Sequence, residues 1–130
     1  TRLRSLADEW VEAHALSADA LAARIRAAGI DVLIDLAGHT AGSRLPAFAR
    51  RPAPLQLTYL GYPTTTGLDE IDFRITDAYV DPEGEREGVA NSERLLRLAH
   101  SYFCFEPGAA PEVAPLPAAR NGYVTFGSFN

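Results

Sequence analysis

The fold of this chain is constrained most strongly by residues 18–36. They contain a helical stretch, one glycine and the run IDVLIDL. Residues 18–28 repeat apolar positions at helical spacing, and Ser17 before them suits a helix N-cap. Gly29 predicts the end of this helix, because glycine tolerates the left-handed conformation common there. The run at 30–36 is aliphatic and β-branched, which predicts a strand. A helix that leads directly into such a strand indicates a parallel α/β sheet.

Three later runs predict further strands of this sheet. LQLTYL at 55–60 and FRITD at 73–77 are short and rich in strand-forming residues, and 95–98 predicts an edge strand. Between the first two strands, residues 43–51 suit a short helix with Ser43 as a possible cap. We therefore expect a parallel α/β lobe.

The two ends of the chain carry different expectations. Residues 2–14 are amphipathic and predict a helix that buries Trp10 in the core. Residues 106–122 have the Pro- and Ala-rich composition of a linker, and 123–130 predict a new strand. We expect 1–105 to be a partial lobe and the whole chain to be a piece of a longer protein.

Charge and cysteine content exclude some classes of function. The net charge is −5, which argues against a nucleic-acid binder that works through a general basic face. The single Cys104 excludes an internal disulfide and suits a reducing cytoplasm. Its apolar surroundings predict a buried, inert thiol. The sequence shows no signal peptide and no apolar run long enough for a membrane span, so we expect no membrane partner.

Two loops follow strands at one predicted edge of the sheet. In parallel sheets, ligands bind at the carboxyl ends of the strands. The segments 35–40 and 60–66 are expected to lie at these ends. His39 is flanked by glycine and threonine, and it suits a general base or a hydrogen-bond donor as well as a structural tie. Asp35 can orient His39, act as a base, or cap the loop backbone, which we favour.

Polar residues around these loops leave alternatives open. Arg44 can meet an anion, whereas Arg50 and Arg51 suit ion pairs with carboxylates such as Asp72. The TTT run can bind hydroxyls or satisfy turn backbones. The acidic run VDPEGEREG predicts a solvated surface loop. The chain contains no Walker loop, GxGxxG, GxSxG elbow or Cys/His metal spacing, so no self-contained catalytic set is predicted.

Several motifs resemble one enzyme family. DLAGHT, RPAPLQLTYLGYPTTTG, DFRITD, DP and YVTFGSFN occur in the order seen in the catalytic region of the O-GlcNAc transferase and SPINDLY glycosyltransferases. The likeness covers 29–130, and GHTA, GYPTTTG and VTFGSFN are similar to the bacterial, SPINDLY-like branch.

The resemblance implies a GT-B fold with Rossmann-like lobes, of which this chain is part of the amino-terminal one, beside tetratricopeptide repeats. It implies inverting transfer of GlcNAc or fucose from UDP-GlcNAc or GDP-fucose to Ser or Thr of an acceptor protein, without cofactor or metal. The residues that match sugar- and acceptor-side motifs are His39, Thr40, Arg44, Leu60, Gly61, Tyr62, Pro63, Thr64 and Thr65.

Two other functions remain open at this stage. The lobe can be a non-enzymatic protein-binding module beside helical repeats, or part of a different α/β transferase. The resemblance makes a fragment of a protein O-glycosyltransferase the leading hypothesis.

Overall fold

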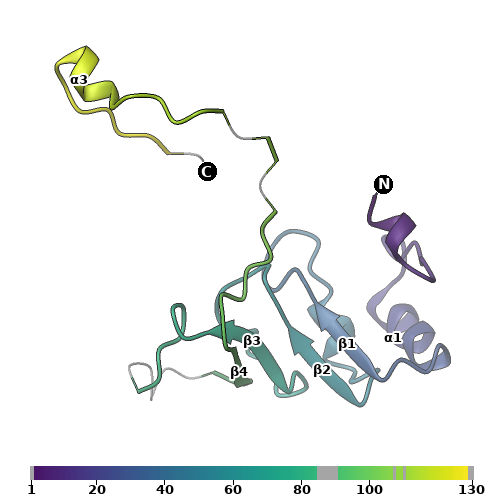
Figure 1. Cartoon of the computed structure of the whole chain (residues 1–130). Helices are drawn as coiled ribbons and strands as arrows, with labels where there is room; N and C mark the ends of the chain where they lie inside the picture. Colours follow the sequence, from purple (N-terminus) through teal and green to yellow (C-terminus); the bar gives the residue numbers. More distant parts are fainter. Residues whose placement is uncertain (1, 85–90, 107, 110, 129–130) are drawn as a thin grey trace.

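The fold is a four-stranded parallel sheet with short helices (Figure 1). A computed structural model describes residues 2–84, 91–106, 108–109 and 111–128. The strands are β1 (Val32–Asp35), β2 (Leu55–Thr58), β3 (Phe73–Asp77) and β4 (Arg94–Leu98), and they lie side by side in that order. All three neighbouring pairs are parallel, as the sequence predicted.

Helix α1 (Ala18–Ala27) begins and ends where its capping residues predicted. Ser17 Oγ accepts a hydrogen bond from the Ala20 amide, and Gly29 has a φ of +65° directly after the helix. Helix α2 (Leu45–Phe48) is shorter than predicted, and Arg44 rather than Ser43 is its N-cap residue.

The core lies between α2 and one face of the sheet. Leu45 and Phe48 of α2 form a buried cluster with Ile71, against which Leu33 of β1 packs. Gln56 of β2 lies beside Leu33 and is fully buried. Its amide nitrogen donates to the carbonyls of Phe48 and Glu70 at 3.0 and 2.8 Å, which ties the sheet to α2.

On the opposite face of the sheet, the two outer strands expose apolar side chains, whereas Leu57 of β2 is buried. Val32 and Ile34 of β1 are 48% and 46% exposed, and Leu96 and Leu98 of β4 are 42% and 41% exposed. The register places these alternate residues on the same face. Parallel sheets are normally covered on both faces, so this face differs from the usual arrangement.

The predicted helix at 2–14 is wrong. Only η1 (Arg4–Leu6), a 3-10 turn, forms there, and Trp10 is 42% exposed rather than buried. Its indole nitrogen donates to Glu12 at 3.0 Å. Leu3 and Leu6 are 70% and 73% exposed, so the apolar face has no surface to pack against. A short isolated helix is marginal without such packing.

The last part of the chain leaves the sheet as an extended arm (Figure 1). Cys104 is exposed there, which corrects the predicted buried thiol. Helix α3 (Pro117–Asn121) forms within the predicted linker. No strand forms at 123–128, and 129–130 lie outside the described residues. A strand needs a hydrogen-bonded neighbour, which sequence propensity does not supply. No helix in the described part is long and apolar enough to cross a membrane.

Candidate functional site

Two loops interlock at the carboxyl ends of β1 and β2. An added Cβ on Gly61 would lie 2.0 Å from the Leu36 carbonyl oxygen, and one on Gly38 would lie 2.4 Å from Tyr62 Cβ. Such distances are far below van der Waals contact, so both positions require the absence of a side chain. Gly38 also has a φ of +52°. The loops predicted to share one edge therefore touch each other directly.

His39 lies exposed at this contact. Its ring meets the Tyr62 ring edge-on, with centroids 5.3 Å apart and an angle of 80° between the planes. Among the residues that the structure describes, neither ring nitrogen has a hydrogen-bond partner. The imidazole is thus held by a ring contact while both nitrogens remain available to a ligand.

Asp35 acts on the loop backbone. It is 3% exposed, and its oxygens accept hydrogen bonds from the amides of Ala37 at 3.1 Å and Gly38 at 2.8 Å. Thr58 Oγ1 of β2 donates to the same carboxylate at 2.9 Å. Of the three roles predicted for Asp35, these contacts fit the loop cap. The carboxylate holds the turn that carries His39.

Replacing Asp35 by asparagine is expected to destabilise the protein by about 2 kcal/mol, because the new amide group must face a backbone N–H or the Thr58 hydroxyl. Denaturant unfolding of the full-length protein measures the change. Asp31→Asn, at the exposed residue just before the same strand, is the matched control and should change the unfolding free energy little. Equal effects for the two variants would contradict the capping role.

The first part of the loop at 60–66 is exposed, whereas Thr66 at its end is buried. Leu60 has a φ of +67° and is 43% exposed, and Tyr62 is 37% exposed. A leucine in the left-handed region is uncommon and strained by about 1–3 kcal/mol, so the surrounding contacts must hold it there. Gly61, Pro63 and Thr64 are also exposed. This predicted ligand-facing segment is therefore accessible.

A hollow of about 360 Å³ lies beside His39. Its lining comes from the His39 loop, α2 and the loop after β2: His39, Ser43, Leu45, Pro46, Ala49, Thr66 and Leu68. The lining is mostly apolar, and its polar members are His39, Ser43 and Thr66. It can accommodate a small polar or sugar-sized group against an apolar wall.

The predicted arginines serve the fold in the described structure. The Arg44 guanidinium donates to the carbonyls of Ala13, His14 and Leu16 at 2.8, 2.8 and 3.1 Å. Thr40 Oγ1 likewise donates within its own loop, to the Ala37 carbonyl at 2.7 Å. These contacts hold the loops and leave ligand binding by Arg44 and Thr40 a prediction.

The predicted ion pair between Arg51 and Asp72 is confirmed, with a nitrogen–oxygen distance of 2.7 Å. Burial raises the pKa of Asp72, but hydrogen bonds from Arg51 and the Gln56 amide outweigh it, so the pKa lies below its usual value. Arg50 pairs instead with Asp19 of α1. Both arginines brace the scaffold below the candidate site.

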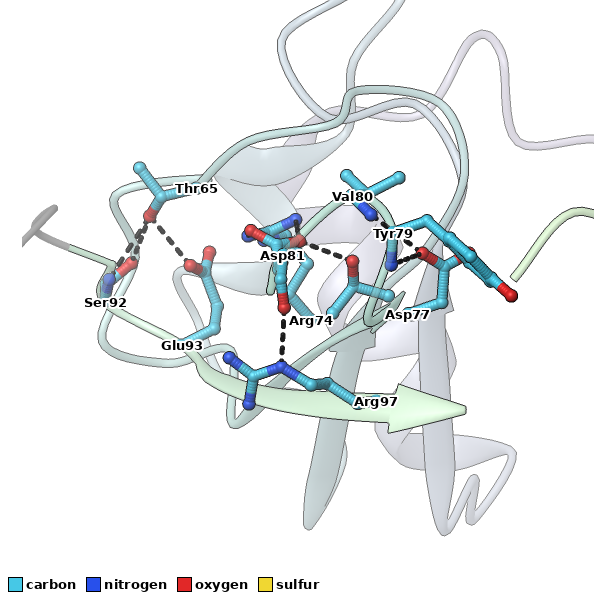
Figure 2. A network of polar contacts seen from close by, with 10 residues as sticks. Thr65, Arg74, Asp77, Tyr79, Val80, Asp81, Ser92, Glu93 and Arg97 are labelled. Carbon is cyan, nitrogen blue, oxygen red and sulfur yellow. Dashed lines mark hydrogen bonds and ion pairs between the residues drawn. The ribbon is translucent and has the colours of Figure 1, made fainter. Parts of the chain in front are cut away.

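A buried polar network that the sequence did not predict lies beside β3 (Figure 2). Arg74 and Asp81 form a two-point ion pair at 3.0 and 2.9 Å, and they are 4% and 0% exposed. Asp81 belongs to VDPEGEREG, so the predicted solvated surface is wrong at this residue, while 85–90 lie outside the described residues. The sequence does carry a signal for this pair, because Arg74 lies between two apolar residues in FRITD. An arginine that faces the core needs an anionic partner.

Asp77 ends β3 as Asp35 ends β1. Its oxygens accept from the amides of Tyr79, Val80 and Tyr102 at 2.8–2.9 Å. The Tyr102 amide contributes most to lowering the pKa of Asp77, and burial opposes it. Both strand-end carboxylates therefore fix loops. In the described segments, no three His, Cys, Asp or Glu residues gather as a metal site.

Comparison with known proteins gives consistent matches. The model of the family described as Glycosyl transferase family 41 matches residues 2–107. The chain is 44% identical over 122 residues to a probable UDP-N-acetylglucosamine–peptide N-acetylglucosaminyltransferase SPINDLY of Solanum lycopersicum. It is 36% identical over 104 residues to a UDP-N-acetylglucosamine–peptide N-acetylglucosaminyltransferase of Caenorhabditis elegans.

The solved structure of an O-GlcNAc transferase mutant from Thermobaculum terrenum matches with a TM-score of 0.78 and 42% identity over 88% of the chain. This likeness confirms the predicted α/β fold as part of a GT-B lobe. The chain spans 13% of the tomato relative and 22% of the solved transferase.

Proposed function

The chain belongs to glycosyl transferase family 41, and we propose that it forms part of the catalytic region of an inverting protein O-glycosyltransferase. In this proposal the whole protein moves a sugar from a nucleotide-sugar donor to Ser or Thr hydroxyls of an acceptor protein. The similarity to relatives named as peptide N-acetylglucosaminyltransferases supports this reaction class.

The observation that carries the proposal is the interlocked pair of loops with His39 and Tyr62 at their contact. Transfer to a hydroxyl needs a group that accepts or relays its proton and donors that orient the sugar. His39 has nitrogens available for the first role. The exposed Thr64 of the neighbouring loop offers a hydroxyl donor for the second.

The loops form one wall of the proposed cleft, and other parts of the whole protein supply the rest. Asp35, Asp77 and Arg44 are engaged in hydrogen bonds within the fold. The described residues therefore offer His39 as the main reactive group. We propose that these 130 residues alone do not catalyse transfer.

Full-length protein that carries this sequence is expected to modify a protein substrate with one of two donors, UDP-GlcNAc or GDP-fucose. Intact-mass analysis, followed by fragmentation that locates the sugar on Ser or Thr, measures the transfer and identifies the donor. Absence of both transfer and donor hydrolysis would contradict the proposal. Acceptor binding without transfer from either donor would favour the alternative, a protein-binding module.

A further inference from the structure

Glu93 lies just before β4 but points its carboxylate at the loop that follows β2 (Figure 2). It is 4% exposed. Thr65 Oγ1 donates to one carboxylate oxygen at 2.7 Å, and the Thr66 amide donates to the other at 2.7 Å. The Thr66 hydroxyl donates to that second oxygen as well. Three donors from one loop thus converge on a single buried carboxylate.

Both carboxylate oxygens of Glu93 act as hydrogen-bond acceptors. Thr65 Oγ1 already accepts from the amides of Gly67 at 3.1 Å and Ser92 at 3.2 Å, so its own hydrogen points to the carboxylate. Burial raises the pKa of Glu93, but hydrogen bonds from Thr66 and Thr65 outweigh it, so the pKa lies below its usual value. The carboxylate is therefore ionised at neutral pH.

Besides the contact of Tyr62 with Gly38 and His39, the loop at 60–66 is held near each of its ends. At one end Gly61 closely approaches Leu36, and at the other Thr65 and Thr66 donate hydrogen bonds to Glu93. Tyr62, Pro63 and Thr64 lie exposed between these points. Thr66 also lines the hollow beside His39, so the Glu93 anchor adjoins the candidate site.

We propose that Glu93 is a positioning residue that holds the loop at 60–66 in its ligand-binding shape. This inference rests on the proposed function, because the loop lines the proposed transfer cleft. In this proposal Glu93 acts through Thr65 and Thr66, because its buried carboxylate is bonded to them. Without the Glu93 carboxylate, the loop at 60–66 samples other conformations. Substrates must then order the loop when they bind, and this entropic cost weakens binding.

Glu93→Gln in the full-length protein tests the proposal, because the new amide NH₂ must face either a Thr65 oxygen that already accepts two N–H donors or the Thr66 N–H. We expect the KM for the donor or the acceptor to rise about tenfold, with kcat changed less than threefold. Hydrogen–deuterium exchange should rise at 61–67 and stay unchanged in α1. Glu112→Gln, on the exposed arm, is the matched control and should match wild type in both measurements.

Thr65→Val provides a second variant that removes the Thr65 hydrogen bond to Glu93, and those from the Gly67 and Ser92 amides, but keeps those of Thr66 to Glu93. A KM increase in the same direction is expected, and it keeps the test valid if Glu93→Gln does not fold. Unchanged KM and exchange in both variants would overturn the inference, as would exchange that rises uniformly over the sheet. No transfer by wild-type protein would overturn the proposed function, and exchange at 61–67 would still test the anchor.

Discussion

Full-length protein with His39 replaced by alanine is expected to lose about 10²–10⁴-fold in the rate of sugar transfer while it stays folded. In the proposed function, the loss follows from removing the imidazole that would accept or relay the proton of the acceptor hydroxyl. The fold should survive because the side chain is exposed and its recorded contact is the Tyr62 ring. Such an aromatic pair contributes about 1 kcal/mol.

Two further variants make the result specific to His39. His100→Ala removes another exposed histidine, beyond β4, and should leave transfer unchanged. His39→Gln keeps hydrogen-bonding capacity but cannot take up a proton, so it separates a proton-accepting role from simple sugar contact. Steady-state kinetics and denaturant unfolding of the three variants measure both effects. Near-normal turnover by His39→Ala would make this residue a structural part of the loop.

The parts of the fold that sequence predicted are those fixed by neighbouring residues. Ser17 and Gly29 bound α1 because caps act over one helical turn. The span 73–77 of β3 was predicted without error, because its ends lie at turn-forming residues. The shared edge of the two loops followed from parallel topology alone.

The parts that sequence missed depend on distant partners. Trp10 is exposed because helical periodicity does not reveal whether a packing surface exists. Asp81 was assigned to a solvated loop because its partner Arg74 lies in a different element. The anchoring role of Glu93 likewise depends on a loop 27 and 28 positions earlier in the chain. In the candidate site, residue types were predictable and their mutual contacts were not.

Gly61→Ala is expected to cost about 3 kcal/mol of stability and about 100-fold in transfer. The new Cβ would meet the Leu36 carbonyl oxygen at 2.0 Å and the Leu36 carbonyl carbon at 2.7 Å. Because these are backbone atoms, no rotamer change relieves the clash. The two loops must separate by more than 1 Å, which moves Tyr62 away from His39.

Controls distinguish this crowding from the general cost of replacing glycine. Gly108 has open space around it and no positive φ, so Gly108→Ala should change neither stability nor transfer. Gly42 has a φ of +80° but also open space, so Gly42→Ala reports the backbone strain alone, about 1 kcal/mol. Denaturant unfolding and initial transfer rates compare the three variants. If Gly61→Ala matched Gly42→Ala in both, the loops would not need their close contact, and His39 and Tyr62 would act without a fixed shared geometry.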